Sequence, residues 1–347
     1  MVYTKKTLAF QVIATSAALL LSGLTMGCGD GSGVNCAEGS TDPACAPPTN
    51  ACATTSQARY VVHQVTMPGA MNHFDYDVDG DGSSENKTET VVSGLEAAGL
   101  SIQAAFDSHL EDGDVLMLVD VQGGSLTTGC ANVILREAQP AAAPPAYNGN
   151  DTFTPNPNYT SVKLAGNLAS GKLTTTAPKN QPPASLGVLK LSVPITLDYK
   201  LPLILYGARV EGQLTAMGIT NGRLHGALKK VDIETYSFPV VAQAITQRIN
   251  ELPNDSEEAL LISIFENQNN QISKDKCMNT PTKCCATNPL TCVITAEEVG
   301  ASPLIQQLIA PDIQMFQSGT WSPSPEGLEP ESLSFGIGFA GVKAKFN

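Results

Sequence analysis

The sequence lacks the motifs by which common hydrolases and nucleotide-binding proteins are identified. It contains neither G-x-S-x-G nor H-E-x-x-H, and no P-loop. The string "GIGFAG" at residues 336–341 matches G-x-G-x-x-G, but it lies inside an alternating strand-like run and no helix follows it, so it does not indicate a nucleotide site. Its four histidines lie far apart, at His63, His73, His109 and His225. His73 adjoins the acidic stretch at residues 74–89, but a solitary histidine in a polar loop is seldom catalytic. The sequence therefore predicts no catalytic residue.

Basic and aromatic residues are also scarce. The chain has 20 Lys and Arg against 33 Asp and Glu, a formal net charge of -13, and only 5% of its residues are aromatic. No basic cluster offsets the acidic surplus, and an acidic surface repels phosphate backbones, so we expect no nucleic-acid partner. The 347 residues, 42% of them hydrophobic, suffice for one large domain or two modest ones.

The N-terminus has the pattern of a secretion signal. Lys5 and Lys6 precede the apolar stretch "LAFQVIATSAALLLSGLTMG". "LTMGC" then places Gly27 directly before Cys28, which resembles a bacterial lipoprotein signal. That resemblance implies removal of residues 1–27 and acylation of Cys28, including palmitate, which anchors the chain to a membrane. A secreted or periplasmic protein and a retained membrane helix are the alternatives. The mature chain would have 18 basic and 33 acidic residues, a net charge of -15.

The cysteines are typical of an oxidising compartment. Nine are present, and eight remain once Cys28 is set aside. These eight fall into two groups of four along the chain, which suggests two local disulfide clusters of undecided connectivity. In the second cluster, bridges from the adjacent cysteines at 284 and 285 to the two flanking cysteines are the simplest arrangement. Zinc is the competing interpretation of the second cluster, but neither C-x-x-C nor a nearby histidine is present. The candidates are Cys36, Cys45, Cys52, Cys130, Cys277, Cys284, Cys285 and Cys292.

Composition divides the chain into segments. Residues 28–58 contain almost no large apolar side chain, which predicts a flexible, cysteine-containing tether. The folded part is expected over residues 59–347, with "RYVVHQVTM" as its first strand. Within it, residues 139–158 are a Pro- and Asn-rich surface excursion, and residues 277–292 are the Cys-rich segment.

Periodicity predicts both strands and helices in the folded part. Apolar residues keep a helical spacing from Val91 to Leu110, as one helix or two, and "VLMLVDV" and "ANVILREA" are typical strands. Odd positions from Leu189 to Leu201 are apolar, which predicts one long strand, at an edge or bulged because of Pro194 and Pro202.

Further strands and helices follow. A second alternating run ends at Ala216, an Asn221-Gly222 turn is expected next, and "SLSFGIGFAGVKAKF" closes the chain. "FPVVAQAITQRINEL", "SEEALLISIFENQ" and "TAEEVGASPLIQQLI" predict helices, the last with a capping box of Thr295 and Glu298. The sequence predicts an α+β fold of predominantly antiparallel sheet, meander or sandwich-like, with a few amphipathic helices. The apolar strand face is either core or an open groove.

The stretch "FDYDVDGDGSSENKTE" has the strongest metal-binding pattern. Alternating carboxylates on a glycine-containing turn suit a hard cation such as calcium, and without one they would repel each other. The stretch resembles an EF-hand or dockerin-like D-x-D-G-D-G loop, although Ser84 and Thr88 replace the apolar eighth residue and the final Glu. Asp75 or Glu89 could complete the shell, and a solvated acidic turn is the alternative. A weaker echo, "TNPLTCVITAEEV", is explained equally by a helix cap. The expected calcium ligands are Asp77, Asp79, Asp81, Ser83, Glu85 and Glu89.

Together, the lipobox, the tether and this loop resemble uncharacterised predicted lipoproteins of Gram-negative bacteria. The resemblance implies a cell-envelope protein, at the outer membrane, with structural calcium and no particular reaction. The leading hypothesis is a non-enzymatic binding or structural protein with envelope proteins or glycans as partners. One alternative is an envelope hydrolase that uses carboxylates near residues 75–89. Another is a carrier of a lipid or other apolar ligand.

Overall fold

The computed structural model describes residues 52–69, 71–79, 82–97, 100–158, 161–176, 188–251, 294–317, 320–321 and 329–347. All of them belong to one compact unit that spans Pro47–Asn347. The predicted signal, Cys28, the predicted helix at 256–268 and the Cys-rich segment lie outside the described residues. No helix of the described chain is long and apolar enough to span a membrane.

The fold is built on one antiparallel sheet that closes on itself. The strand order is β6-β5-β3-β2-β1-β12-β9-β8-β7, and β6 pairs in addition with β8. Eight of the nine strands of this sheet, all but β7, therefore form a ring, which removes the exposed edges that an open sheet would have. The ring strands are β1 (Ser56–Thr66), β2 (Met117–Gly123), β3 (Thr128–Glu137), β5 (Val162–Ala169), β6 (Lys172–Thr176), β8 (Lys200–Leu214), β9 (Gly218–Lys229) and β12 (Ser332–Lys343).

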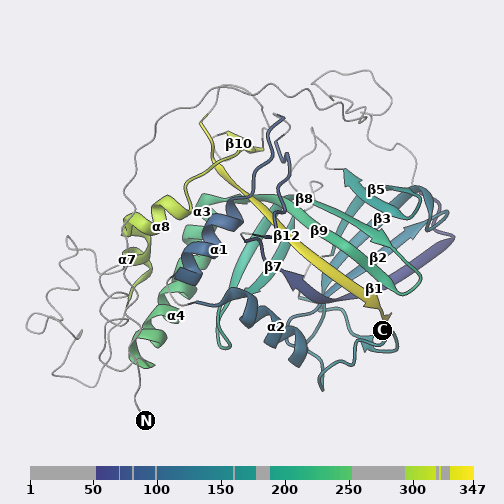
Figure 1. The fold of residues 1–347 in the computed structure, drawn as a ribbon, viewed down its shortest axis with the longest axis horizontal. Coiled ribbons are helices and arrows are strands. Elements are labelled where there is room, and N and C mark those ends of the chain that lie inside the picture. Colours follow the sequence, from purple (N-terminus) through teal and green to yellow (C-terminus); the bar gives the residue numbers. More distant parts are fainter. Residues whose placement is uncertain are drawn as a thin grey trace, which may run out of the picture. The chain divides into compact units, whose positions relative to one another are not determined.

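The helices gather at one end of this ring, and the β2–β3, β5–β6 and β8–β9 turns lie at the other (Figure 1). Helix α4 packs on α7, α1 packs on β12 and α8, and α2 packs on β1 and β7. Their bounds are α1 (Lys87–Ala97), α2 (Ile102–Asp112), α3 (Lys230–Asp232), a π-helical turn η2 (Ile233–Ser237), α4 (Phe238–Glu251), α7 (Ala296–Ala301) and α8 (Pro303–Leu308).

The remaining strands are short and lie outside the ring. β7 (Leu189–Pro194) pairs with the first part of β8, as a strand at the sheet's edge. β10 (Phe316–Gln317) pairs with β11 (Thr320–Trp321), and β4 (Thr152–Phe153) pairs in parallel with β13 (Lys345–Phe346). The excursion at 139–158 thus contributes β4 to the outer surface of the sheet, where Phe153 is buried.

One hydrophobic core runs from the inside of the ring to the helices. Alternate residues of the strands point inward, among them Tyr60, Val133 and Leu205, and each is almost fully buried. The same core continues into Phe106 of α2 and Ile245 of α4. The helices therefore close the helical end of the ring, as expected for elements with one apolar face.

The predicted α+β fold with predominantly antiparallel sheet is confirmed. The helical pattern between Val91 and Leu110 forms two helices. The capping box at α7 is present, because Glu298 N donates to Thr295 Oγ1 at 3.2 Å and Thr295 N donates to Glu298 Oε2 at 2.8 Å. Since Glu298 is engaged in this cap, the helix explains the weaker metal-like echo around it. β1 begins at Ser56, before the predicted start at Arg59.

Two details of the strand prediction are wrong. The apolar run from Leu189 to Leu201 is not one strand, because Ile195 N donates to Tyr199 O at 3.0 Å and turns the chain between β7 and β8. Thr196 Oγ1 holds this turn by accepting from the backbone of residues 198 and 199. The predicted Asn221-Gly222 turn lies instead inside β9. The turn itself spans residues 215–217, and Asn221, at φ 50°, adjoins an irregularity of the β8–β9 register.

Candidate functional site

The acidic stretch forms a hairpin-like loop between β1 and α1. Tyr76 and Glu85 pair through their backbones with two N–O distances of 3.3 Å, which closes the base of the loop. Inside it, Gly82 N donates to Asp77 Oδ2 at 3.2 Å, and Gly82 has a φ of 92°. A side-chain bond to a backbone five residues on, with a glycine in the left-handed region, gives a compact acidic turn.

Phe74 fixes the loop to the outer face of β12. A Cβ atom at Gly338 would lie 2.4 Å from the Phe74 ring, and one at Gly336 would lie 2.3 Å from the Phe74 carbonyl oxygen. The two glycines therefore make room for the loop. Asn86 Nδ2 adds hydrogen bonds to Phe74 O at 3.3 Å and Gly336 O at 3.1 Å.

The far side of the loop is attached through β8 and the segment before β10. Arg209 of β8 donates to the carbonyl oxygens of Asp77 at 3.4 Å and Val78 at 3.2 Å. Val78 itself is buried in a small cluster with Met315. Gln314 N donates to Asp79 Oδ2 at 3.1 Å. The loop is thus a packed part of the fold rather than a solvated excursion.

The described residues do not gather the predicted calcium ligands around one point. They contain no group of three or more His, Cys, Asp or Glu side chains placed to hold a metal ion. Asp79 accepts from Gln314, and Glu89 Oε2 lies 3.1 Å from His73 Nδ1. Asp81, the third of the alternating carboxylates, lies outside the described residues. Calcium at this loop stays a prediction.

Near the loop, the described residues pair one histidine with a carboxylate, His73 with Glu89, as an acid–base catalyst could. The His73 side chain is 54% exposed to solvent and that of Glu89 is 30% exposed. They line none of the three cavities described below, whereas a general base needs a substrate held within hydrogen-bond distance. The geometry of the described chain gives the hydrolase hypothesis no support.

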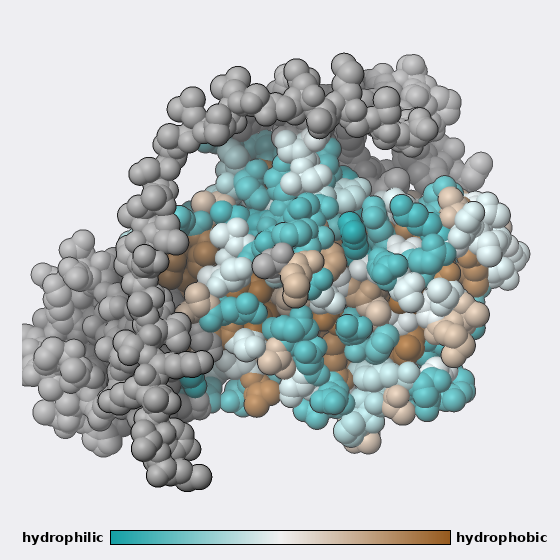
Figure 2. Space-filling model, viewed as in Figure 1, coloured by the Kyte–Doolittle hydropathy of each residue, from teal (hydrophilic) through white to brown (hydrophobic). Residues whose placement is uncertain are grey.

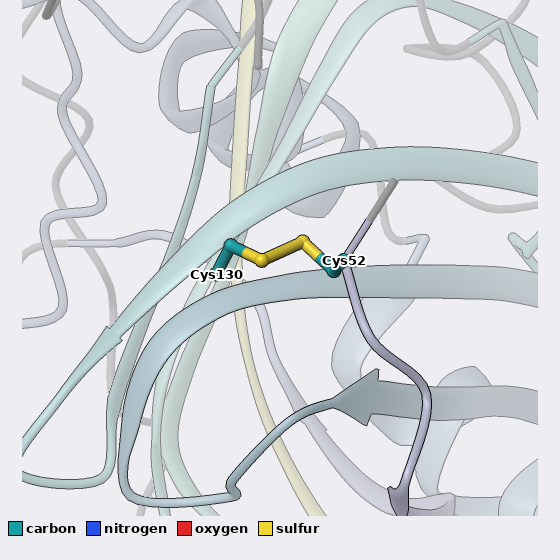
Figure 3. The surroundings of a disulfide bond; sticks show 2 residues. All are labelled: Cys52 and Cys130. Atoms are coloured by element: carbon teal, nitrogen blue, oxygen red, sulfur yellow. A yellow bond between two sulfur atoms is a disulfide. The ribbon is translucent and has the colours of Figure 1, made fainter. Parts of the chain in front are cut away.

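A disulfide joins Cys52 to Cys130 (Figure 3). Their Cα atoms lie 5.7 Å apart, and 78 positions separate them in the sequence. The bond ties the segment that leads into β1 to the start of β3, at the hairpin end of the ring. Two of the four cysteines predicted for the first cluster are therefore paired, and the other six candidates lie outside the described residues.

An apolar cavity of about 100 Å³ lies between the sheet and the helices. A smaller one, of about 50 Å³, lies near α2, and a larger hollow lies at the hairpin end. In the face shown in Figure 2, hydrophobic residues are scattered among hydrophilic ones. The lining of the 100 Å³ cavity includes Leu95 of α1, Val241 of α4, Val299 of α7, Ile305 of α8, Leu201 of β8 and Phe335 of β12.

The few polar groups beside this cavity already have partners. Thr88 Oγ1 donates to Ser334 O at 3.5 Å, Ser237 Oγ donates to Pro202 O at 3.1 Å, and the hydroxyl of Ser334 bonds Asp312. A cavity without free polar groups stays dry, because water needs two to four polar partners. The cavity can therefore hold an apolar group but offers no specific polar recognition.

Sequence reasoning located only part of this cavity. It identified the apolar strand face that begins at Leu189, as core or open groove, and Val193 and Leu201 of that face line the cavity. It could not place α1 and α8, which approach from distant parts of the chain. Searches against protein-family models, curated proteins and solved structures find no match for this chain.

Proposed function

We propose that the protein is a non-enzymatic binding protein of the cell envelope that holds an apolar group in the cavity between the sheet and the helices. The observation that carries this proposal is the lining of that cavity, in which hydrocarbon side chains from five helices and the sheet surround about 100 Å³ of dry space. An apolar cavity of about 150 Å³ is large enough to bind benzene or xenon. The ligand is therefore a short hydrocarbon segment, such as the end of an acyl chain.

The placement of the cavity supports a binding role over a purely structural one. A void in a core costs stability, and cores are normally packed without voids of this size. Two of the helices that cover it, α7 and α8, have only six residues each. Short helices open locally at low free-energy cost, which gives a ligand a route to the interior.

A lipid anchor at Cys28 and calcium in the acidic loop belong to the same proposal. The anchor would hold the binding domain in the cell envelope, where acyl chains are abundant. Calcium would neutralise the loop that packs on β12 and leads into α1, and so would stabilise one wall of the cavity. These two features give the domain its location and its rigidity, and neither takes part in a reaction.

A fluorescent polyene fatty acid, cis-parinaric acid, tests the proposal. We expect saturable binding to the mature chain and competition by saturated fatty acids. Val241→Phe places a larger side chain in the cavity from α4 and should weaken binding at least about tenfold, since overfilling removes the space for the ligand. The matched control is Val231→Phe, because Val231 is 59% exposed and does not line the cavity. Equal affinity of both variants and the wild type would contradict the proposal.

A further inference from the structure

The strand pairings bring five separate segments together at the end of the ring opposite the helices. Ser56 pairs with Gly123, Thr128 with Ala169, Lys172 with Gln213, and Gly218 with Val342. We call this set of segments the hairpin end. It comprises residues 52–58, 122–130, 167–174, 212–220 and 341–346.

Hydrogen bonds between neighbouring turns hold the hairpin end together. Gly171 N donates to Thr127 O and Leu214 N donates to Gly171 O, both at 2.8 Å, and Lys343 N donates to Met217 O at 3.1 Å. Thr55 Oγ1 donates to Gly124 O at 3.2 Å. With the Cys52–Cys130 disulfide, these bonds make a connected surface whose shape is fixed by backbone groups.

The charge of the hairpin end is opposite to that of the chain. Its five segments contain no Asp or Glu, although the whole chain has 33. Lys172, Lys343 and Lys345 are exposed there. The nearest carboxylates belong to Glu211, which adjoins segment 212–220 and pairs with Thr174 across β6 and β8, to Asp120, which is buried beside Arg59 and Arg136, and to Asp151, which accepts from Ala146 N. The helical end carries the exposed acids Glu96, Asp107, Glu111, Asp112, Asp114, Asp198 and Glu297.

Its shape and remaining residues also suit a lipid surface. Met217 is 71% exposed at the tip of the β8–β9 turn. Beside it, a hollow of about 640 Å³ is lined by Arg59, Lys343 and Lys345 together with uncharged residues, among them Leu126 and Leu214. At the right of Figure 2, where Figure 1 places the hairpins, the surface is largely pale, the colour of intermediate hydropathy. Apolar and cationic side chains on a neutral background are the composition of membrane-surface sites.

The chain also enters the domain at this end. Cys52 precedes β1 and is fixed to Cys130, so residues 28–51 connect Cys28 to the hairpin end. If these residues form the tether that their composition predicts, a chain of this length has a root-mean-square span of roughly 27 Å. An anchor at Cys28 would therefore keep the hairpin end close to the membrane, where even a weak contact is populated because the effective concentration is high.

We infer that the hairpin end docks on the surface of a membrane rich in anionic phospholipid. Lys172, Lys343 and Lys345 face the headgroups, Met217 enters the interfacial layer, and the acidic helical end with its apolar cavity points away. The charge asymmetry alone would orient the domain in this way. Docking needs no acyl chain, so it can be tested separately from lipidation and from ligand binding in the cavity.

The test uses the chain from residue 28 onward with Cys28→Ser, so that no acyl chain contributes. Co-sedimentation with phosphatidylcholine vesicles is compared with and without phosphatidylglycerol. We expect binding only with phosphatidylglycerol, and a decrease with rising salt. Lys172→Gln/Lys343→Gln/Lys345→Gln should lower the partition coefficient roughly a hundredfold, because each lysine near an anionic surface contributes about 1 kcal/mol.

The matched control is Lys163→Gln/Lys190→Gln/Lys200→Gln, which removes the same charge outside the hairpin end and should bind as the parent does. A Met217→Asp variant should also bind more weakly than the parent. Equal loss in both triple variants, binding that ignores phosphatidylglycerol, or no sedimentation with either vesicle would each overturn the inference. Circular dichroism and the melting temperature of every variant establish that it is folded.

Discussion

The imidazole ring of His225 stacks on the phenol ring of Tyr76, with the ring centroids 4.5 Å apart and the planes 27° from parallel. This contact places the acidic loop directly over a fully buried histidine of β9. Among the described residues, neither ring nitrogen of His225 has a hydrogen-bond partner. Burial, with the positive charges of Arg223 and Arg209, lowers the pKa of His225 to about 4.

This lowered pKa predicts a loss of stability in acid. The unfolded chain takes up a proton at His225 near its ordinary pKa of 6.5, and the folded protein does so only near 4. The neutral His225 therefore costs no stability above pH 6.5. As the pH falls from 6.5 toward 4, the free energy of unfolding decreases by roughly 3 kcal/mol. In urea unfolding across this range, His225→Phe should lose less stability than the wild type. An unchanged dependence of the free energy of unfolding on pH in His225→Phe would contradict the account.

The disulfide predicts a second stability effect. Cys52→Ala/Cys130→Ala should lower the free energy of unfolding by about 2–4 kcal/mol, since the bond restricts a long loop in the unfolded chain. Hydrogen exchange should quicken at the start of β1, the segment that the bond holds. Urea unfolding measures this difference. If the variant is as stable as the oxidised wild type, the bond contributes nothing to the free energy of unfolding.

The calcium loop predicts sensitivity to chelation. Removing divalent cations should lower the melting temperature of the mature chain, and Asp79→Ala/Asp81→Ala should abolish this difference because its ligands are gone. Glu96→Ala/Asp112→Ala removes the same charge from exposed positions and should keep the difference. Identical melting of the wild type with and without chelator would exclude a structural calcium ion at this loop.

Lipidation predicts where the protein fractionates in a Gram-negative host. Wild-type protein should sediment with membranes and remain there after a high-salt wash. Cys28→Ser should be released by that wash, because the salt screens the remaining electrostatic contact at the hairpin end. Mass spectrometry of the N-terminal peptide identifies the acyl chains. A Cys28→Ser protein that resists the wash would show that another element anchors the chain.

The elements of the fold follow closely from sequence periodicity. β1, β2, β3, β12 and helix α4 were each predicted, because alternation or helical spacing is a local property of the chain. Local turn chemistry was harder to interpret. Thr196 gives the apolar run after Leu189 a turn without Gly or Asn, and Asn221 adopts a positive φ within a strand.

The closure of the sheet and the cavity could not be predicted. The pairing of Lys172 with Gln213, which closes the ring, joins strands whose sequences contain no sign of the partner. The cavity is formed where Leu95, Val241 and Ile305 meet, and these residues lie in three distant segments. Each segment shows only an apolar face, and an apolar face looks the same whether it meets a filled core or a void.

Xenon binding in a crystal tests the central claim most directly, because the proposed cavity is apolar, dry and large enough for one atom. Under xenon pressure, we expect a single strong peak in contact with Leu95, Val241 and Ile305, and its loss in Val241→Phe. A cavity region without xenon in the wild type, or an equal peak in Val241→Phe, would contradict the proposal that this protein holds an apolar group between its sheet and its helices.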